Sequence, residues 1–160
     1  MGRLFLEQNE GKPLNRWLNT AKSAYALPDA RELNALQLAY IGDTLHDLYV
    51  RSLLLSRRLN AGAMHRQAIR MVSASAQAAM LEAIAPDLTQ EEADAVRRGR
   101  NAQAKHAAPR NQDPADYAHA TGLEALWGYL YVTGRTDRLH ELMNQALSRT
   151  EDIWHRQNSR

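Results

Sequence analysis

Two acidic side chains lie inside apolar helical segments, where a charge needs a partner. Asp43 follows Gly42 in the segment LAYIGD, and Glu124 follows Gly122 closely in the segment TGLEALWG. A carboxylate at the edge of a buried helix face is costly unless it pairs with a cation. If the two helices cross near Gly42 and Gly122, both carboxylates converge on one divalent ion, and oxygen ligands suit Mg²⁺. The alternative is that each carboxylate pairs separately with an arginine and that the glycines serve only helix packing.

Other kinds of catalytic site find no support in the sequence. The chain has no cysteine, which excludes thiol nucleophiles, disulfides and thiolate metal sites. Its six histidines show no zinc-binding spacing, and His46 and His119 are interpreted as surface or hydrogen-bonded core groups. The serine-nucleophile motif GxSxG, the phosphate-binding P-loop and the dinucleotide-binding motif GxGxxG are also missing. Carboxylate chemistry through Asp43 and Glu124 is therefore the leading catalytic hypothesis.

The positive charges indicate a phosphate-rich partner, although the net charge is only +2. Residues 48–81 hold five arginines, and residues 95–112 hold four arginines and a lysine, with no acidic residue in either range. Arginine outnumbers lysine by 17 to 3, and its planar fork binds phosphate oxygens two at a time. A GC-rich genome is an equally good explanation of the arginine bias. No apolar run is long enough to span a membrane, and we expect a cytoplasmic protein.

The elements that must position these side chains are all predicted to be helices. Alanine, leucine, glutamine, arginine and glutamate abound while valine and phenylalanine are scarce, a composition typical of an all-α domain. Apolar residues recur at a spacing of three or four, and capping residues mark several helix starts. We expect six or seven helices. The main ones span residues 31–58, 61–71 (capped by Asn60), 74–84 (capped by Ser73), 90–99 (capping box at Thr89), 114–132 (opened by Asp113 and Pro114) and 136–148.

Three further segments lie between or outside these helices. Residues 1–30 are predicted to be an N-terminal arm, with a short helix over residues 13–21. Residues 31–148 form the predicted single domain, and residues 149–160 form a polar tail. Within the domain, residues 99–112 lack apolar periodicity and are predicted to be a mobile, basic loop that serves a function. A solvated connector is the alternative for this loop.

Four motifs, in their order along the chain, resemble those of the ribonuclease III family: LQLAYIGD, VSASAQA, RRGRNAQA and TGLEALWGYLY. The resemblance is closest to the Mini-ribonuclease III branch, which lacks a double-stranded-RNA-binding domain, and it covers residues 31–148. It implies a single ribonuclease III-type endonuclease domain. Asp43 matches the family's catalytic aspartate and Glu124 its metal-binding glutamate, so both are assigned to catalysis and to Mg²⁺. Full-length ribonuclease III carries two further acids where this chain has Ala39 and Thr121, a departure that the Mini-ribonuclease III branch shares.

The resemblance also implies a homodimeric endoribonuclease that cleaves double-stranded RNA and leaves 3′-hydroxyl and 5′-phosphate ends. The expected substrate is ribosomal RNA precursor, at the ends of the 23S RNA, with a ribosomal protein as an auxiliary partner. Asp47, one turn after Asp43, is either an outer support of the metal site or a solvated acid. The arginines of residues 51–70 form a secondary basic face. Phosphate contacts are assigned to Arg98, Arg100, Asn101, Lys105 and Arg110.

Two functions from other classes stay open. A non-catalytic RNA-binding or ribosome-assembly protein would keep the fold, and Ala39 and Thr121 are what such a loss of acids would look like. The presence of both Asp43 and Glu124 argues for activity instead. A helical DNA-binding protein depends only on the arginines, because no helix-turn-helix signal is present.

Overall fold

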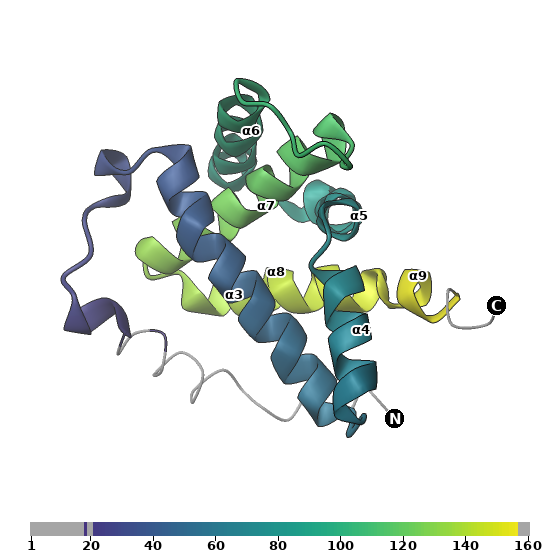
Figure 1. Cartoon of the computed structure of the whole chain (residues 1–160). Helices are drawn as coiled ribbons and strands as arrows, with labels where there is room; N and C mark the ends of the chain where they lie inside the picture. The colour runs from purple at the N-terminus through teal and green to yellow at the C-terminus, as the bar shows by residue number, and fades with distance from the viewer. Residues whose placement is uncertain (1–17, 19–20, 157–160) are drawn as a thin grey trace.

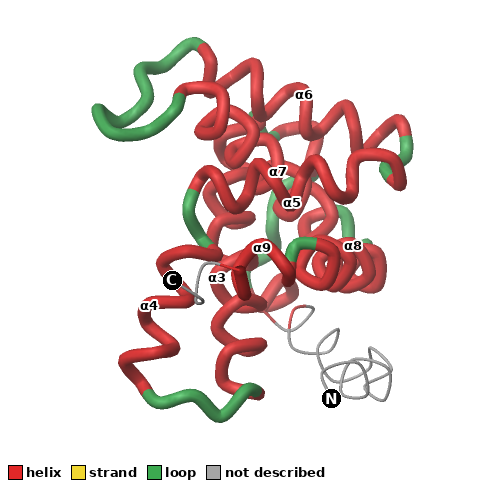
Figure 2. Tube along the Cα trace, turned by 90° about the vertical axis from the view of Figure 1, so that its right-hand side faces the viewer, coloured by secondary structure: helices red, strands yellow, loops and turns green. Residues whose placement is uncertain are grey.

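The chain is built from helices joined by short connections, with no strand among residues 18 and 21–156, which this computed structural model describes (Figure 2). The all-α prediction is therefore confirmed. Helices α3 and α7 cross near the centre, with α6 above them, α8 below and α4 beside α3 (Figure 1). In chain order the elements are the 3₁₀ helix η1 (Ala30–Glu32), α3 (Ala35–Ser56), α4 (Ala61–Met71), α5 (Ala74–Ile84), the 3₁₀ helix η2 (Ala85–Asp87), α6 (Gln90–Ala104), α7 (Pro114–Val132), α8 (Thr136–Arg149) and α9 (Glu151–Arg156).

The first long helix starts at Ala35, whereas the sequence predicted a start near residue 31. Asn34 caps α3 by accepting a hydrogen bond from the Gln37 backbone N–H at 2.9 Å, and the Gln37 side chain accepts one from the Asn34 N–H. Residues 30–32 form the separate 3₁₀ helix η1, which the Asp29 carboxylate caps. Two consecutive caps thus divide a stretch whose apolar spacing looks continuous.

Four of the other predicted helix starts are confirmed by their caps, whereas α8 begins at Thr136 as predicted without a side-chain cap. The side chains of Asn60 and Ser73 accept hydrogen bonds from the third residues of α4 and α5, at 2.9 and 3.2 Å. Thr89 and Glu92 form the predicted capping box at the start of α6. Asp113 accepts two backbone N–H bonds at the start of α7. Each of these contacts spans at most three positions, which is why the sequence shows them.

Helix α6 continues past its predicted end at Gly99 and stops at Ala104. Gly99 is not a helix terminator but is buried against α7, where a Cβ atom would lie 2.9 Å from the Cα atom of Gly122. A side chain at this position would hold the two helices apart. The segment predicted as a loop is therefore helical up to residue 104, and only residues 105–113 connect α6 to α7.

Helix α7 lies at the centre of the core, because it packs against α3, α5, α6 and α8. Its predicted apolar stripe is confirmed from Leu123 to Tyr131, whereas Tyr117 near its start is only half-buried. Gly134, with a φ of 75°, ends this helix region as predicted. No helix in the described part is long and apolar enough to cross a membrane. The largest fully buried side chains are those of Trp127, Leu54, Met71, Met80, Ile84, Leu123, Leu126, Leu130, Leu139, Leu142, Met143 and His46.

Segments near both ends of the described chain pack on this body. Leu18, from the predicted N-terminal arm, is buried in the core, and residues 21–24 are helical. Most of the short helix predicted over residues 13–21 lies outside the described residues. At the other end, helix α9 occupies a segment that was predicted as a polar tail. An ion pair of 2.5 Å between Arg57 and Glu151 ties the end of α3 to α9.

Candidate active site

The helices that carry Asp43 and Glu124 touch through their backbones at two glycines. A Cβ atom on Gly42 of α3 would lie 1.7 Å from the carbonyl oxygen of Glu124 in α7. A Cβ atom on Gly128 of α7 would lie 1.9 Å from the carbonyl oxygen of Leu38 in α3. Non-bonded atoms cannot come so close, so only glycine allows the helices to approach at both points. The close crossing at Gly42, which the sequence raised as a condition for a joint site, is present.

Gly122 has a different role from the one that the sequence suggested. It does not lie at the crossing with the Asp43 helix but faces α6. A Cβ atom there would lie 2.9 Å from the carbonyl oxygen of Val96 and 2.7 Å from Cγ of Arg100. Helix α7 is therefore in close contact with α3 on one side and with α6 on the other. Helix α7, which carries Glu124, thus packs both against the helix of Asp43 and against the helix of the predicted RNA contacts.

This packing brings the two predicted carboxylates under each other's electrostatic influence. Asp43 is exposed, whereas Glu124 is half-buried. Burial, and then the negative charge of Asp43, raise the pKa of Glu124 to about 7, against the lowering effect of a hydrogen bond from Gln77. Neither carboxylate forms an ion pair with any residue in the described part of the chain. The alternative of two separate arginine partners is thus not found there.

A divalent cation fits this pair of carboxylates. Two like charges without a counter-charge repel each other, and a bound cation would remove the repulsion and offset the burial cost of Glu124. The two positions where full-length ribonuclease III has acids add no ligand, because Ala39 is buried and the Thr121 hydroxyl donates to the Tyr117 carbonyl at 3.1 Å. Among the described residues, no group of three or more metal-binding side chains gathers. Water would fill the other ligand positions, as it commonly does around Mg²⁺.

One residue that the sequence did not single out holds Glu124 directly. The buried Gln77 side chain on α5 donates from Nε2 to Glu124 Oε1 at 3.1 Å and to the carbonyl oxygen of Val72 at 3.2 Å. Gln77 lies inside the VSASAQA motif, but no local feature distinguishes it from other polar helix residues. Its role depends on the packing of α5 against α7, which only the fold reveals.

The two histidines considered from the sequence are hydrogen-bonded residues of helices. His46, one turn after Asp43, is fully buried, and its Nε2 lies 3.1 Å from the carbonyl oxygen of Met71. Because a carbonyl only accepts, Nε2 carries the proton, and the buried Nδ1 has no partner among the described residues. Burial lowers the pKa of His46, which keeps the ring neutral. His119 is half-buried, with Nδ1 2.6 Å from the carbonyl oxygen of Ala115.

Asp47 is paired with a cation away from the carboxylate pair. It forms an ion pair of 2.7 Å with Arg51, four positions later on the same helix, and both side chains are substantially exposed. Such pairs at exposed positions contribute little to stability. Of the two alternatives for Asp47, the solvated acid is the one that agrees with the structure.

The predicted RNA-contact residues form an exposed set at the second half of α6 and just beyond it. None of the cations in this set forms an ion pair with a described residue, whereas Arg97 on the same helix pairs with Asp94 at 2.9 Å. The set therefore offers charge that the protein itself does not neutralise. Its members are Arg98, Arg100 and Asn101 on α6, Lys105 at the end of α6, and Arg110 in the connection to α7.

A second exposed surface is apolar and lies on α3, the helix that carries Asp43. The side chains of Tyr40, Leu48 and Leu55 are 84, 45 and 66% exposed. At about 3.6 residues per turn, a step of seven positions returns to within about 20° of the same side of a helix and a step of eight to within about 80°, so the three side chains lie within about a quarter of a turn. The three side chains thus share one face, called here the apolar face of α3. A row of exposed large apolar side chains is typical of a contact surface.

Known proteins resemble this chain in sequence and in fold. The family model described as Ribonuclease III domain matches residues 36–135, which include both carboxylates. The Mini-ribonuclease 3 of Symbiobacterium thermophilum is 50% identical over 115 residues, covering 71% of this chain and 88% of the relative. That of Enterococcus faecalis is 40% identical over 124 residues, covering 76% of this chain and 93% of the relative. A crystal structure of a protein from Fusobacterium nucleatum has a TM-score of 0.68 at 25% identity, covering 76% of this chain and 98% of the other.

Proposed function

This chain belongs to the ribonuclease III family, in its Mini-ribonuclease III branch, and is therefore an endoribonuclease; we propose that it uses Mg²⁺ and cleaves double-stranded RNA. The observation that carries the proposal is the backbone contact of α3 with α7. It brings an exposed Asp43 and a half-buried Glu124 together without a counter-charge from a described residue. An arrangement that is unfavourable in the free protein becomes favourable when a cation binds.

Asp43 and Glu124 are the residues that would hold Mg²⁺, which when bound supplies an activated water and offsets the charge that develops on the attacked phosphate. The rest depends on the chain's own groups. Gly42 and Gly128 fix the distance between the two acidic helices. Gln77 holds one oxygen of Glu124 and leaves the other available. We propose that cleavage leaves 3′-hydroxyl and 5′-phosphate ends.

The exposed cations of α6 support a nucleic-acid substrate. Phosphate contacts of this kind position an enzyme on a duplex but read little sequence. We therefore propose that selection depends on RNA shape, with ribosomal RNA precursor, at the ends of the 23S RNA, as the substrate. A ribosomal protein that shapes the RNA would act as auxiliary partner. The absence of cysteine agrees with a reducing compartment, and we propose the cytoplasm.

We propose that two copies of the chain associate through the apolar face of α3. An A-form duplex presents its two strands across the minor groove, and a two-fold dimer offers one carboxylate site to each strand. Tyr40, the most exposed of the three side chains at 84%, is the residue to change. Sedimentation velocity should show a dimer for the wild type and a monomer for Tyr40→Glu. A variant that stays dimeric would place the interface elsewhere.

The cleavage experiment compares wild type, Asp43→Asn and Asp47→Asn on a long double-stranded RNA with Mg²⁺. Asparagine keeps the shape of the side chain and removes its charge. We expect Asp43→Asn to lose at least about a thousandfold in rate, because metal-assisted hydrolysis depends on this ligand. Asp47→Asn is the matched control, since Asp47 lies on the same helix and is already paired with Arg51.

The outcomes separate the alternatives. Cleavage by wild type and Asp47→Asn alone supports the proposal. Equal cleavage by all three proteins would show that Asp43 is not the catalytic carboxylate. If wild type binds the RNA but does not cut it, the chain is an RNA-binding or assembly protein that has lost activity along with the acids at the positions of Ala39 and Thr121.

A further inference from the structure

The amide of Gln77 joins three elements at one point. Its Nε2 donates to Glu124 Oε1 on α7, at 3.1 Å, and to the carbonyl oxygen of Val72 between α4 and α5, at 3.2 Å. Both acceptors are oxygen atoms that carry no proton when Glu124 is ionised, so the orientation of the amide is fixed by chemistry. The side chain is only 3% exposed.

The oxygen atom of the same amide lies in an unfavourable environment. Gln77 Oε1 is buried and has no hydrogen-bond partner among the described residues. A buried polar atom without a partner costs about 1–3 kcal/mol, and an apolar side chain of similar size would avoid this cost. Stability alone therefore favours a residue such as methionine at this position. The advantage of an amide at this position must therefore come from the hydrogen bonds that its nitrogen donates to Glu124 and Val72.

The acceptor that anchors this nitrogen is itself held in place. The Val72 carbonyl adjoins that of Met71, which accepts a hydrogen bond from the buried His46 on α3. Gln77 is thus fixed to the junction of α4 and α5, and the junction is fixed to the helix that carries Asp43. A nitrogen held in this way directs one oxygen of Glu124, which leaves the second oxygen for a cation.

We propose that Gln77 is a positioning residue of the active site: it orients the Glu124 carboxylate for the metal ion without contacting the metal or the RNA. This inference rests on the proposed function. Groups that hold a metal ligand in orientation commonly contribute about 10–100-fold to metal affinity or activity. The same order of effect is expected here.

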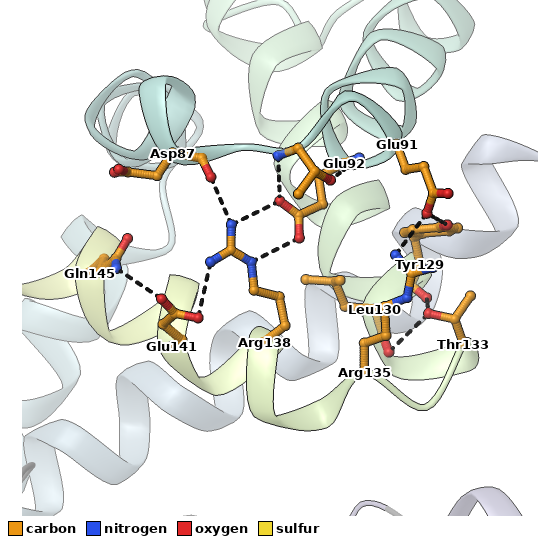
Figure 3. A network of polar contacts seen from close by, with 11 residues as sticks. Asp87, Glu91, Glu92, Tyr129, Leu130, Thr133, Arg135, Arg138, Glu141 and Gln145 are labelled. Carbon is orange, nitrogen blue, oxygen red and sulfur yellow. Dashed lines mark hydrogen bonds and ion pairs between the residues drawn. The ribbon is translucent and has the colours of Figure 1, made fainter.

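The test measures Mg²⁺ affinity by titration calorimetry, without RNA, for wild type, Gln77→Met and Gln145→Met. Methionine is close to glutamine in size and removes the amide. Gln145 on α8 is the matched control, because its Nε2 also donates to a glutamate, Glu141, and its Oε1 is also buried without a described partner (Figure 3). We expect about tenfold weaker Mg²⁺ binding for Gln77→Met and wild-type binding for Gln145→Met. The Mg²⁺ concentration for half-maximal cleavage should rise by the same factor.

A third variant covers the case in which Gln77→Met does not fold. Gln77→Asn keeps the amide but shortens the side chain by one methylene, so the amide nitrogen no longer reaches both acceptors, and this variant should also weaken Mg²⁺ binding. Folded Gln77 variants that bind Mg²⁺ as wild type does would overturn the positioning role while cleavage by wild type still supports the proposed function. Equal weakening in Gln145→Met would also overturn it. Failure of wild type both to bind Mg²⁺ and to cut RNA would overturn the proposed function and this inference together.

Discussion

Glu92 on α6 is a buried acid and Glu124 on α7 a half-buried one, and they differ in which groups surround the charge. Glu92 is 2% exposed and lies against the guanidinium of Arg138, with contacts of 2.8 and 3.1 Å to its two oxygens. The same guanidinium donates to the carbonyl oxygen of Asp87 at 2.7 Å, and the Thr89 N–H donates to Glu92 (Figure 3). Glu124 has one neutral amide and, nearby, a second negative charge.

The difference is visible in how readily each group loses its proton. Burial acts to raise the pKa of Glu92, but hydrogen bonds from Arg138 and Thr89 outweigh it and hold the pKa below its ordinary value. Burial and the charge of Asp43 raise the pKa of Glu124 to about 7. The protein thus neutralises the buried acid that joins α6 to α8 and leaves uncompensated the acid that would meet a cation. Arg138 thus compensates the charge of Glu92, whereas no described residue compensates that of Glu124, the proposed metal ligand.

The largest effect on stability should follow from removing the cation of the compensated pair. Arg138→Met leaves Glu92 buried without its partner, which we expect to cost about 3 kcal/mol of unfolding free energy. Urea denaturation at pH 7 measures this cost. Arg97→Met is the control, because its pair with Asp94 is exposed, and it should change the free energy by less than about 1 kcal/mol. Similar losses in both variants would show that burial of Glu92 does not decide the effect.

A somewhat smaller effect should appear as a dependence of stability on pH. The folded pKa of Glu124, about 7, lies above its ordinary value of 4.5, so the folded state holds a proton that the unfolded state has released. The resulting stability is fully present below pH 4.5 and is lost as the pH rises through about 7, a change of about 2–3 kcal/mol between pH 5 and 8. For Glu92, whose pKa is lowered, the sign is opposite: its contribution is present above pH 4.5 and is lost as the pH falls through the folded pKa.

Denaturation of wild type and Glu124→Gln from pH 5 to 8, in the presence of a chelator, tests this difference. Wild type should lose stability across this interval relative to the variant, and saturating Mg²⁺ should restore it only in wild type. Two curves that stay parallel over the interval would show that Glu124 does not titrate there, and the contrast with Glu92 would fail.

The smallest expected effect concerns cations: cations on α6 that pair with no described residue should contribute to RNA affinity, whereas a paired cation on the same helix should not. Replacing Arg98, Arg100 and Lys105 with alanine removes charge that no described residue neutralises. We expect RNA affinity to fall about tenfold, and the slope of log affinity against log salt to decrease by about two to three. Arg97→Ala, which removes a neutralised cation from the same helix, should leave both nearly unchanged. Fluorescence anisotropy of labelled duplex RNA at several salt concentrations measures both quantities. An unchanged slope in the triple variant would rule out α6 as the phosphate-binding element.

The parts of the fold that were predicted correctly depend on contacts between near neighbours in the chain. The caps at Asn60, Ser73 and Thr89 each join residues three positions apart, and all were predicted. Asn34 and Gln37 form the same kind of box, but the apolar spacing from residue 31 onward hid it. Helix caps can be predicted from the sequence where the apolar spacing does not continue across them.

The remaining errors at Gly99 and Gln77 concern residues whose roles depend on a distant partner. Gly99 looks like a helix terminator in its local context, but its contact with Gly122 on α7 requires a glycine inside a continuous helix. Asp43 and Glu124 were identified because charge within an apolar stripe is anomalous at any position. Gln77 was missed because nothing near it in the chain is anomalous, and its significance arises only when α5 packs beside Glu124. The two candidate carboxylates could be named from the sequence, whereas the amide that hydrogen-bonds to Glu124 could not.

The glycine contacts between α3 and α7 bear on how this protein can change during evolution. Because backbone atoms set the separation of the two helices at Gly42 and Gly128, side chains elsewhere in the core can be exchanged for one another without altering it. The distance between the acids is therefore inherited independently of the surfaces on α3 and α6. Changes on those surfaces therefore need not move the two acids relative to each other. The same arrangement concentrates vulnerability in two positions, where a single added methyl group would separate the acids.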